Sequence, residues 1–157
     1  MAYVLDMNTI KIMVLHYYRE TFHSLWNEID KLIANGDIIS VREVKKEIDN
    51  FYKKDKLSDW ADDNREIFIN PTDDDLVFIR EIFRVNHFQS LVKKQNILMG
   101  KPVADPFVIA KAKNINGIVV TQEAYKKNAA KIPNVCEHFD IECINLEQLM
   151  KREQWKF

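Results

Sequence analysis

The sequence has few of the residues that build zinc or redox centres. It contains two cysteines, Cys136 and Cys143, which are seven residues apart and lack the CxxC spacing of a metal or redox site. Its four histidines show no HxH or HExxH pairing. Zinc catalysis therefore has little support. Because the other features favour the cytosol, we expect both cysteines to be reduced thiols rather than a disulfide.

Long apolar runs are also missing. No stretch approaches the roughly 20 apolar residues that span a membrane, and no charged and then apolar leader precedes Val4. We therefore expect a cytoplasmic protein with no membrane partner. There is no repeat, low-complexity tract or clear linker. The 157 residues, 46% of them hydrophobic, are predicted to form a single domain over 1–157.

Positive and negative charges nearly balance in this chain, with 23 Lys and Arg residues against 24 Asp and Glu residues. The formal net charge is −1, which excludes a generic binder of polyanions. Basic residues nevertheless gather after Ser40 and on both sides of Asp105. They are either ordinary solvated helix faces or a rim of positive charge that attracts phosphate toward an acidic centre. This basic set comprises Arg42, Lys45, Lys46, Lys53, Lys54, Lys56, Lys93, Lys94, Lys101, Lys111, Lys113, Lys126 and Lys127.

Apolar strands and helical patterns alternate along the chain, which is typical of an α/β fold with a mainly parallel sheet. Thr72 is a plausible N-cap for the helix over 73–84. Apolar runs that predict strands lie at 2–6, 117–121 and 141–144, with a further short run at 37–40. Helical patterns lie at 9–19, 21–34, 41–84 with restarts near 57 and 71, 86–99, 105–112 and 146–152.

Two acidic residues lie where predicted strands end. Asp6 closes the run 3–5, and Glu123 follows the run 117–121. The carboxyl ends of parallel strands meet at one edge of a sheet, where the sites of open α/β proteins form. We therefore expect these two carboxylates to approach each other.

Two further acids lie on early helical turns. Asp105 precedes Pro106 at the entry of an apolar, alanine-rich helix, so its carboxylate is expected near a helix N-terminus. Glu47 lies in a helix that Ser40 is predicted to cap, beside an inner stripe of Val41, Val44 and Ile48. Glu43 lies four residues earlier on nearly the same face and is the alternative to Glu47.

Taken singly, each acid can be a helix cap or a solvated surface residue. Four carboxylates that converge would repel one another unless cations lie among them, and oxygen-only clusters suit Mg²⁺ or Mn²⁺. Three neighbouring polar residues can support such a centre. Asn8 and Thr9 can hold the Asp6 carboxylate or metal-bound water, or form only a turn and cap, and Thr121 can orient Glu123 or another acid.

The segments 4–9, 40–48, 104–112 and 119–123 resemble, in this order and spacing, the PIN-domain family of metal-dependent nucleases. The resemblance implies a three-layer α/β/α fold with an acidic groove at the carboxyl ends of the strands. It also implies hydrolysis of RNA phosphodiesters with Mg²⁺ or Mn²⁺ held by Asp6, Glu47, Asp105 and Glu123. In one respect the sequence departs from the family, which usually has Asp where Glu123 stands.

Many small members of this family are the toxin half of a type II toxin–antitoxin pair. The resemblance therefore implies an RNA substrate, an antitoxin protein as a possible partner, and a possible homodimer. The aromatic residues Tyr17, Tyr18, Phe22 and Trp26 could provide a surface for such a partner segment or a dimer.

Two other interpretations remain open. Residues 6–9 also resemble the first motif of haloacid-dehalogenase phosphatases, but Asn8 stands where the second aspartate of that motif belongs, and no convincing lysine and acidic pair follows Thr121. A non-catalytic PIN-like module that binds RNA or protein is the second alternative, because Glu123 departs from the family pattern.

Overall fold

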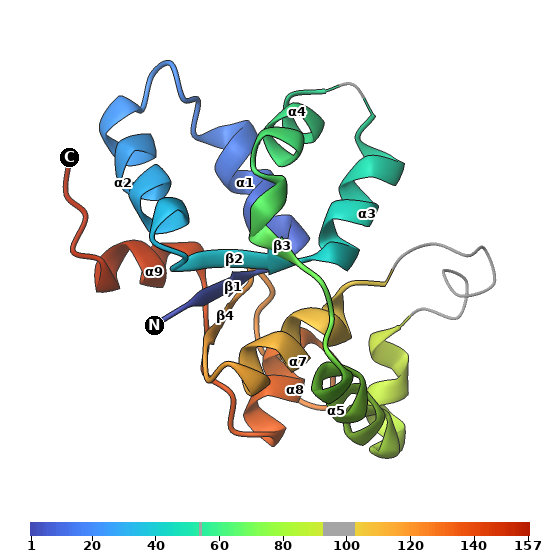
Figure 1. Cartoon of the computed structure of the whole chain (residues 1–157). Coiled ribbons are helices and arrows are strands. Elements are labelled where there is room, and N and C mark those ends of the chain that lie inside the picture. Colours follow the sequence, from blue (N-terminus) through green and yellow to red (C-terminus); the bar gives the residue numbers. More distant parts are fainter. Residues whose placement is uncertain (54, 93–102) are drawn as a thin grey trace.

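The structure, a computed structural model, describes residues 1–53, 55–92 and 103–157 (Figure 1). In this part of the chain, five parallel strands form one sheet in the order β3-β2-β1-β4-β5. From the central β1 the chain builds β2 and β3 on one side and later β4 and β5 on the other. The order therefore reverses between β1 and β4, the position where open α/β sheets form crevices. The strands are β1 (Tyr3–Leu5), β2 (Ile38–Val41), β3 (Phe68–Ile69), β4 (Ile118–Val120) and β5 (Cys143–Ile144).

Helices cover both faces of the sheet. Figure 1 shows α1, α2, α3 and α4 on one face and α5, α7 and α8 on the other, so the predicted three-layer α/β/α architecture is confirmed. None of the described helices is both long and apolar enough to cross a membrane. The helices are α1 (Met7–His16), α2 (His23–Ala34), α3 (Arg42–Phe51), α4 (Lys56–Asp63), α5 (Asp73–Arg84), α7 (Asp105–Asn114), α8 (Ile132–His138) and α9 (Leu146–Arg152), with 3₁₀ turns η1 (Arg65–Ile67) and η2 (Asn86–Leu91).

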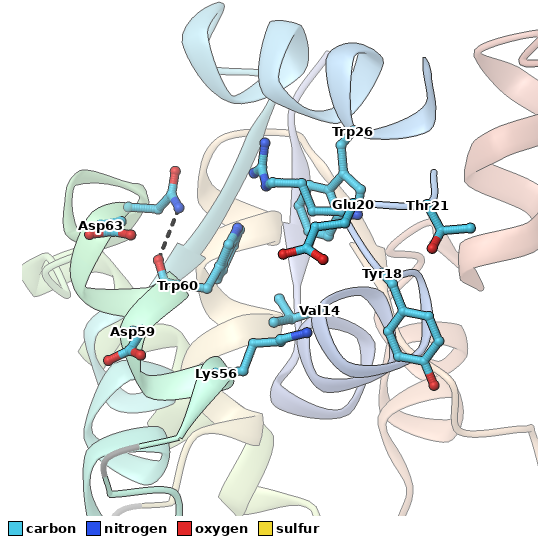
Figure 2. Close-up of a pocket in the computed structure, with 11 residues that line it drawn as sticks. Val14, Tyr18, Glu20, Thr21, Trp26, Lys56, Asp59, Trp60 and Asp63 are labelled. Carbon is cyan, nitrogen blue, oxygen red and sulfur yellow. Dashed lines mark hydrogen bonds between the residues drawn. The ribbon is translucent and has the colours of Figure 1, made fainter. Parts of the chain in front are cut away.

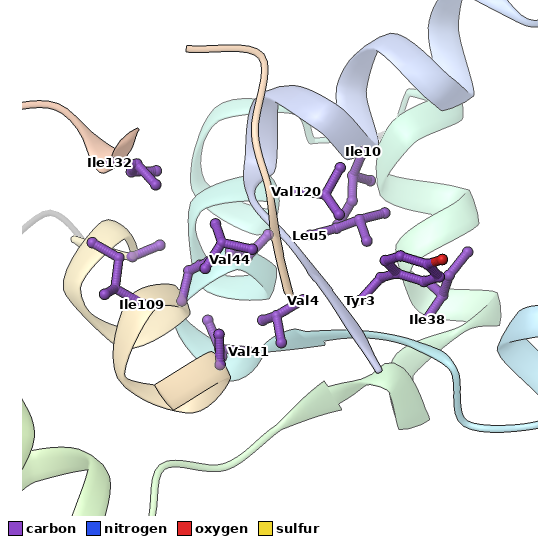
Figure 3. Close-up of a cluster of buried hydrophobic side chains, with 14 of the residues drawn as sticks. Tyr3, Val4, Leu5, Ile10, Ile38, Val41, Val44, Ile109, Val120 and Ile132 are labelled. Carbon is purple, nitrogen blue, oxygen red and sulfur yellow. The ribbon is translucent and has the colours of Figure 1, made fainter. Parts of the chain in front are cut away.

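The central strands are buried on both faces because helices pack on each side. Val4 pairs with Ile39 and with Val119, and all three residues of β1 and all three of β4 are buried. Their side chains, all apolar except for the hydroxyl of Tyr3, join residues of the flanking helices in one core (Figure 3). The predicted inner stripe of α3, Val41, Val44 and Ile48, is buried within this core.

The close approach of β1 and β4 fixes the register at the edge of the sheet. The Ile118 amide donates to the Ala2 carbonyl at 2.9 Å. A Cβ atom on Gly117 would lie only 2.8 Å from that carbonyl oxygen, so this position admits glycine alone without a backbone shift. As a result Leu5 pairs with Val120, and the residues that follow each strand emerge side by side.

Several local predictions need correction. Ser40 does not cap α3: it lies inside β2, and its hydroxyl donates to the Leu5 carbonyl at 2.7 Å, while Val41 is the N-cap residue. The 41–84 segment contains the short strand β3, and α8 interrupts a region where no helix was expected. Of the helix predicted over 86–99, residues 86–91 form a 3₁₀ turn, and 93–99 lie outside the described residues.

Candidate active site

Asp6 lies directly after β1 and is the N-cap residue of α1. Its Oδ1 accepts a hydrogen bond from the Thr9 amide at 2.9 Å, and its Oδ2 accepts one from the Thr121 hydroxyl at 2.5 Å. The Thr9 hydroxyl donates to the Val120 carbonyl at 3.1 Å. Asp6 is only 3% exposed. The carboxylate is thus a helix cap and, at the same time, a fixed group at the switch point of the sheet.

Thr121 connects Asp6 with the segment that carries Glu123. Its hydroxyl donates to Asp6 and accepts from the Glu123 amide at 3.1 Å. The Glu123 side chain turns toward α8, where its Oε2 accepts from the Ile132 amide at 2.9 Å. The glutamate side chain, one methylene longer than an aspartate, spans the distance from the strand end to the start of α8.

Asp105 and Glu47 meet at the start of α7. Asp105 is the first residue of this helix, with Pro106 next to it, as predicted. The Glu47 Oε1, which comes from α3, accepts from the Ala104 amide at 2.9 Å. The N-terminus of α7 thus has one carboxylate on its first residue and a second carboxylate bound to the preceding amide, which places two negative groups at the positive end of a helix dipole.

The pKa values show that these four carboxylates share one electrostatic environment. The pKa of Asp105 is raised to about 8, chiefly by burial, and the negative charges of Glu123, Asp6 and Glu47 add to the effect. Burial also raises the pKa of Glu47 to about 7, against the hydrogen bond from Ala104 and together with the charge of Asp6. The pKa of Asp6 is raised by burial, although hydrogen bonds from Thr121 and Thr9 oppose this.

The oxygen-only chemistry of this donor set fits a hard divalent cation such as Mg²⁺ or Mn²⁺. A cation would also neutralise the repulsion that raises the pKa of Asp105. Within the described residues, however, no three histidine, cysteine, aspartate or glutamate side chains are already arranged to hold a metal ion. One oxygen of Glu47 and one of Glu123 are held by backbone amides instead.

The alternative acid, Glu43, lies elsewhere. Its Oε1 accepts from Arg42 Nε and Nη2 at 3.0 and 2.8 Å. Its Oε2 is buried and has no hydrogen-bond partner in the described part of the chain. The structure thus joins Glu47, rather than Glu43, to the start of α7. Asn8, the other supporting candidate, is exposed on the first turn of α1.

The predicted basic rim is only partly present. Lys111 is buried and pairs with Asp75 at 2.6 Å, so it belongs to the core rather than to a phosphate-binding face. Lys45 pairs with Asp49 and Asp62. Of the residues that the structure describes, Lys46, Lys126 and Lys127 are exposed cations close in sequence to the acids. Four of the predicted basic residues, Lys54, Lys93, Lys94 and Lys101, lie outside the described residues.

Sequence patterns gave no sign of two contacts at the site. Both donors, the amides of Ala104 and Ile132, are backbone groups, and any residue other than proline supplies one. The one available signal was Pro133, which favours a helix beginning near it. That signal would have indicated α8, and with it the amide that holds Glu123.

A separate cavity of about 580 Å³ lies between the α1–α2 connection and α4 (Figure 2). Its walls include Trp26, Trp60 and Tyr18, with Arg19 packed over the ring of Trp26 at 4.4 Å from its centroid. The buried indole N–H of Trp60 has no acceptor among the described residues. Trp155 lines a second cavity of about 500 Å³ together with Tyr17 and Phe22. The aromatic residues singled out in the sequence therefore line two hollows beside α2.

A solved structure and a protein-family model each match most of this chain. A chain in the crystal structure of VapBC2 from Rickettsia felis bound to a DNA fragment from their promoter superposes with a TM-score of 0.55 at 16% identity, covering 92% of this chain and 98% of that one. At this identity the similarity shows the fold, which agrees with the PIN-like α/β/α prediction. No curated protein matches the sequence. The family described as "Domain of unknown function (DUF4411)" matches residues 3–157, and the chain belongs to this family.

Proposed function

We propose that the protein is a metal-dependent endoribonuclease with its active centre at Asp6, Glu47, Asp105 and Glu123. The observation that carries the proposal is the mutual effect of these acids: the three others all raise the pKa of Asp105. Among the described residues none of these four carboxylates has an ion-pair partner, and carboxylates gathered in this way at a topological switch point are typical of functional sites rather than of stabilising ones.

Asp6 and Asp105 would hold Mg²⁺ or Mn²⁺ directly, with help from Glu47 and Glu123. Such an ion would lower the pKa of a bound water and stabilise charge on a phosphate. The protein's own groups act around that centre. Thr121 keeps the Asp6 carboxylate in one orientation by its 2.5 Å hydrogen bond, and the N-terminus of α7 favours an anionic phosphate nearby. A carboxylate that is not bound to metal is available to accept the proton of the attacking water.

The substrate class follows from family resemblance and is supported by surface charge. Lys126 and Lys127 follow Glu123 closely, and Lys46 precedes Glu47; all three are exposed. Exposed ammonium groups beside an acidic centre suit a phosphodiester backbone. We assign RNA as the substrate. We also propose that residues 1–157 form a single domain.

The similarity in fold to a chain of the VapBC2 complex supports a toxin role with an antitoxin protein as partner. The cavity between α1, α2 and α4 offers to a partner segment its aromatic walls and the Trp60 N–H, which has no acceptor in the described part of the chain. If the neighbouring gene encodes the partner, its co-expression should restore the growth of cells that make this protein. Harmless overexpression of a protein with an intact site would contradict the toxin role.

The nuclease proposal is tested with labelled structured RNA, single-stranded RNA and DNA, each incubated with Mn²⁺, Mg²⁺ or EDTA. We expect metal-dependent cleavage of RNA by the native protein and none by the Asp6→Asn protein, because asparagine removes a negative ligand while keeping the shape of the side chain. Folded native protein that cuts none of these substrates, purified free of any bound partner, would overturn the proposal and favour a non-catalytic binding module.

The two glutamates of α3 provide a matched pair of variants. Glu47→Gln is expected to lower kcat/KM by more than about 10-fold, since even groups that only support a metal ligand typically contribute 10–100-fold. Glu43→Gln should stay within about 3-fold of the native value, because Glu43 contacts Arg42 rather than the other acids. Steady-state cleavage of the same RNA measures both. The reverse order of effects would reassign the second acid to Glu43.

A further inference from the structure

The two cysteines lie together at the junction between α8 and β5. Cys136 is on α8 and fully buried, and Cys143 begins β5 and is partly exposed. The connection between them is short and fixed: the Ile141 amide donates to the Cys136 carbonyl at 2.8 Å. Each thiol also shifts the pKa of the other, so side chains seven residues apart in sequence are neighbours in the fold.

This thiol pair connects the two elements that border the acidic centre. On one side, α8 supplies the Ile132 amide that holds Glu123, and Asn134 on its first turn accepts from the Lys126 amide and donates to the Lys126 carbonyl at 2.7 Å. On the other side, the Ile144 carbonyl in β5 accepts from the Thr121 amide at 2.9 Å. A change in the distance between α8 and β5 therefore acts at once on Glu123 and on Thr121, the two residues that surround Asp6.

The two thiols differ in reactivity. The hydrogen bond from Cys136 lowers the pKa of Cys143, although burial and the charges of Asp6 and Glu123 oppose this. The hydrogen bond and burial raise the pKa of Cys136. The partly exposed Cys143 is therefore the sulfur that reacts first with a molecule from solvent, and Cys136 is placed to resolve the product.

We propose that Cys136 and Cys143 form a redox-modification site, at which exchange with a low-molecular-weight disulfide such as oxidised glutathione closes an intramolecular disulfide. The Cys143 thiolate attacks one sulfur of the glutathione disulfide and releases one glutathione thiolate. The Cys136 thiolate then attacks Cys143 Sγ and releases the second. In balance, two protein thiols lose two protons and two electrons, and one disulfide becomes two glutathione thiols.

Closure of this bond displaces α8. A disulfide holds its sulfurs at about 2.05 Å, closer than two free thiols can approach, and we infer that α8 shifts toward β5 to accommodate the bond. The Ile132 amide moves with it, and its hydrogen bond to Glu123 is lost or lengthened. The resulting decrease in cleavage rests on the proposed function, whereas formation of the disulfide and the loss of this hydrogen bond do not.

The first test uses the full chain, reduced and then equilibrated at graded ratios of reduced to oxidised glutathione, followed by acid quench, intact mass and peptide mapping. We expect one protein species whose intact mass is lower by two hydrogens, and peptide mapping should locate its disulfide between Cys136 and Cys143. Cys136→Ala should stop at the mixed disulfide on Cys143, and Cys143→Ala should stay largely unmodified. Two free thiols at the most oxidising ratio, a stable glutathione adduct on the native chain, or a disulfide only between two chains would overturn the proposal.

The second test follows the effect on the acidic centre without relying on activity. Amide hydrogen exchange at Ile132 should become at least about 10-fold faster in the oxidised protein, and dithiothreitol should reverse the change. Cys136→Ala treated in the same way should show no such change. Unchanged exchange at Ile132 in a fully oxidised native protein would overturn the coupling to Glu123. Because this result does not require cleavage, it is distinct from a failure of the nuclease proposal.

Discussion

Asp105→Asn is expected to abolish metal-dependent RNA cleavage and, at the same time, to stabilise the metal-free protein at about pH 8. Groups that merely support a metal ligand contribute 10–100-fold, so loss of a direct ligand should lower kcat/KM by more than about 100-fold. The gain in stability has the same origin as the loss of activity. The carboxylate is buried among three other acids, and the neutral amide is free of their repulsion.

The sign of the pH dependence follows from the raised pKa. Below the ordinary value of 3.8, Asp105 is protonated in the folded and the unfolded chain, and it has no effect on the free energy of unfolding. Between that value and about 8, the unfolded chain releases the proton and the folded chain retains it. The free energy of unfolding therefore falls across this range and levels off above it. Asparagine removes this contribution, for a difference of about 5–6 kcal/mol at the upper end.

Urea unfolding in EDTA at several pH values between these limits measures this effect. Asp74→Asn is the matched control, because Asp74 lies exposed in the first turn of α5 and is not among the charges that raise the pKa of Asp105. The stability of this variant should follow the native curve. Mn²⁺ should stabilise the native protein and the control but not Asp105→Asn. A variant that is less stable than the native protein at every pH would show that Asp105 serves the fold rather than a metal centre.

Three features could be predicted from the sequence: the sheet, its parallel character and the convergence of Asp6 with Glu123. Apolar runs that end in acids indicate the carboxyl edge of a sheet. The same reasoning placed Asp105 at a helix start through Pro106. It could not separate Glu47 from Glu43. That choice depends on which side chain reaches the Ala104 amide, a contact over 57 residues of sequence.

Other failures have similar causes. The strand β3 is only two residues long, too short for alternation to reveal it. Lys111 looked like part of a basic surface because a lysine on a helix is usually exposed. Its partner, Asp75, follows Asp73 and Asp74, and nothing in this run of three acids marks the third as the buried one. Only the packing of α5 against α7 shows that the two charges neutralise each other in the interior.

Asp75→Asn is expected to destabilise the protein by about 3–5 kcal/mol, because it leaves the buried ammonium group of Lys111 without a counter-ion. The side chains of Lys111 and Asp75 are 5% and 1% exposed, and their charged atoms are 2.6 Å apart. Asp75 also accepts from the Thr72 amide at 2.9 Å and from Asn114 at 2.8 Å. The carboxylate therefore completes the capping box of α5 and joins α5 to α7.

Thermal and urea unfolding of Asp75→Asn, Lys111→Met and the double variant measure the pair. The double variant should recover part of the loss, because removal of both charges leaves neither one buried alone. Lys151→Met is the matched control, since its ion pair with Glu147 is exposed and its removal should cause no measurable change. If the single and double variants lose equal stability, the two charges do not act as a pair.

The pH dependence of Asp75 has the opposite sign to that of Asp105, and this difference separates the fold from the site. Burial acts to raise the pKa of Asp75, but the hydrogen bonds from Lys111, Asn114 and Thr72 outweigh it and hold the pKa below 3.8. The stabilisation is therefore complete above that ordinary value and is lost as the pH falls through the lowered pKa. Asp75→Asn should thus cost most stability near neutral pH, where Asp105→Asn increases it. Below its own unfolding temperature, Asp75→Asn should still cleave RNA, because its contacts lie between α5 and α7 and not among the four acids.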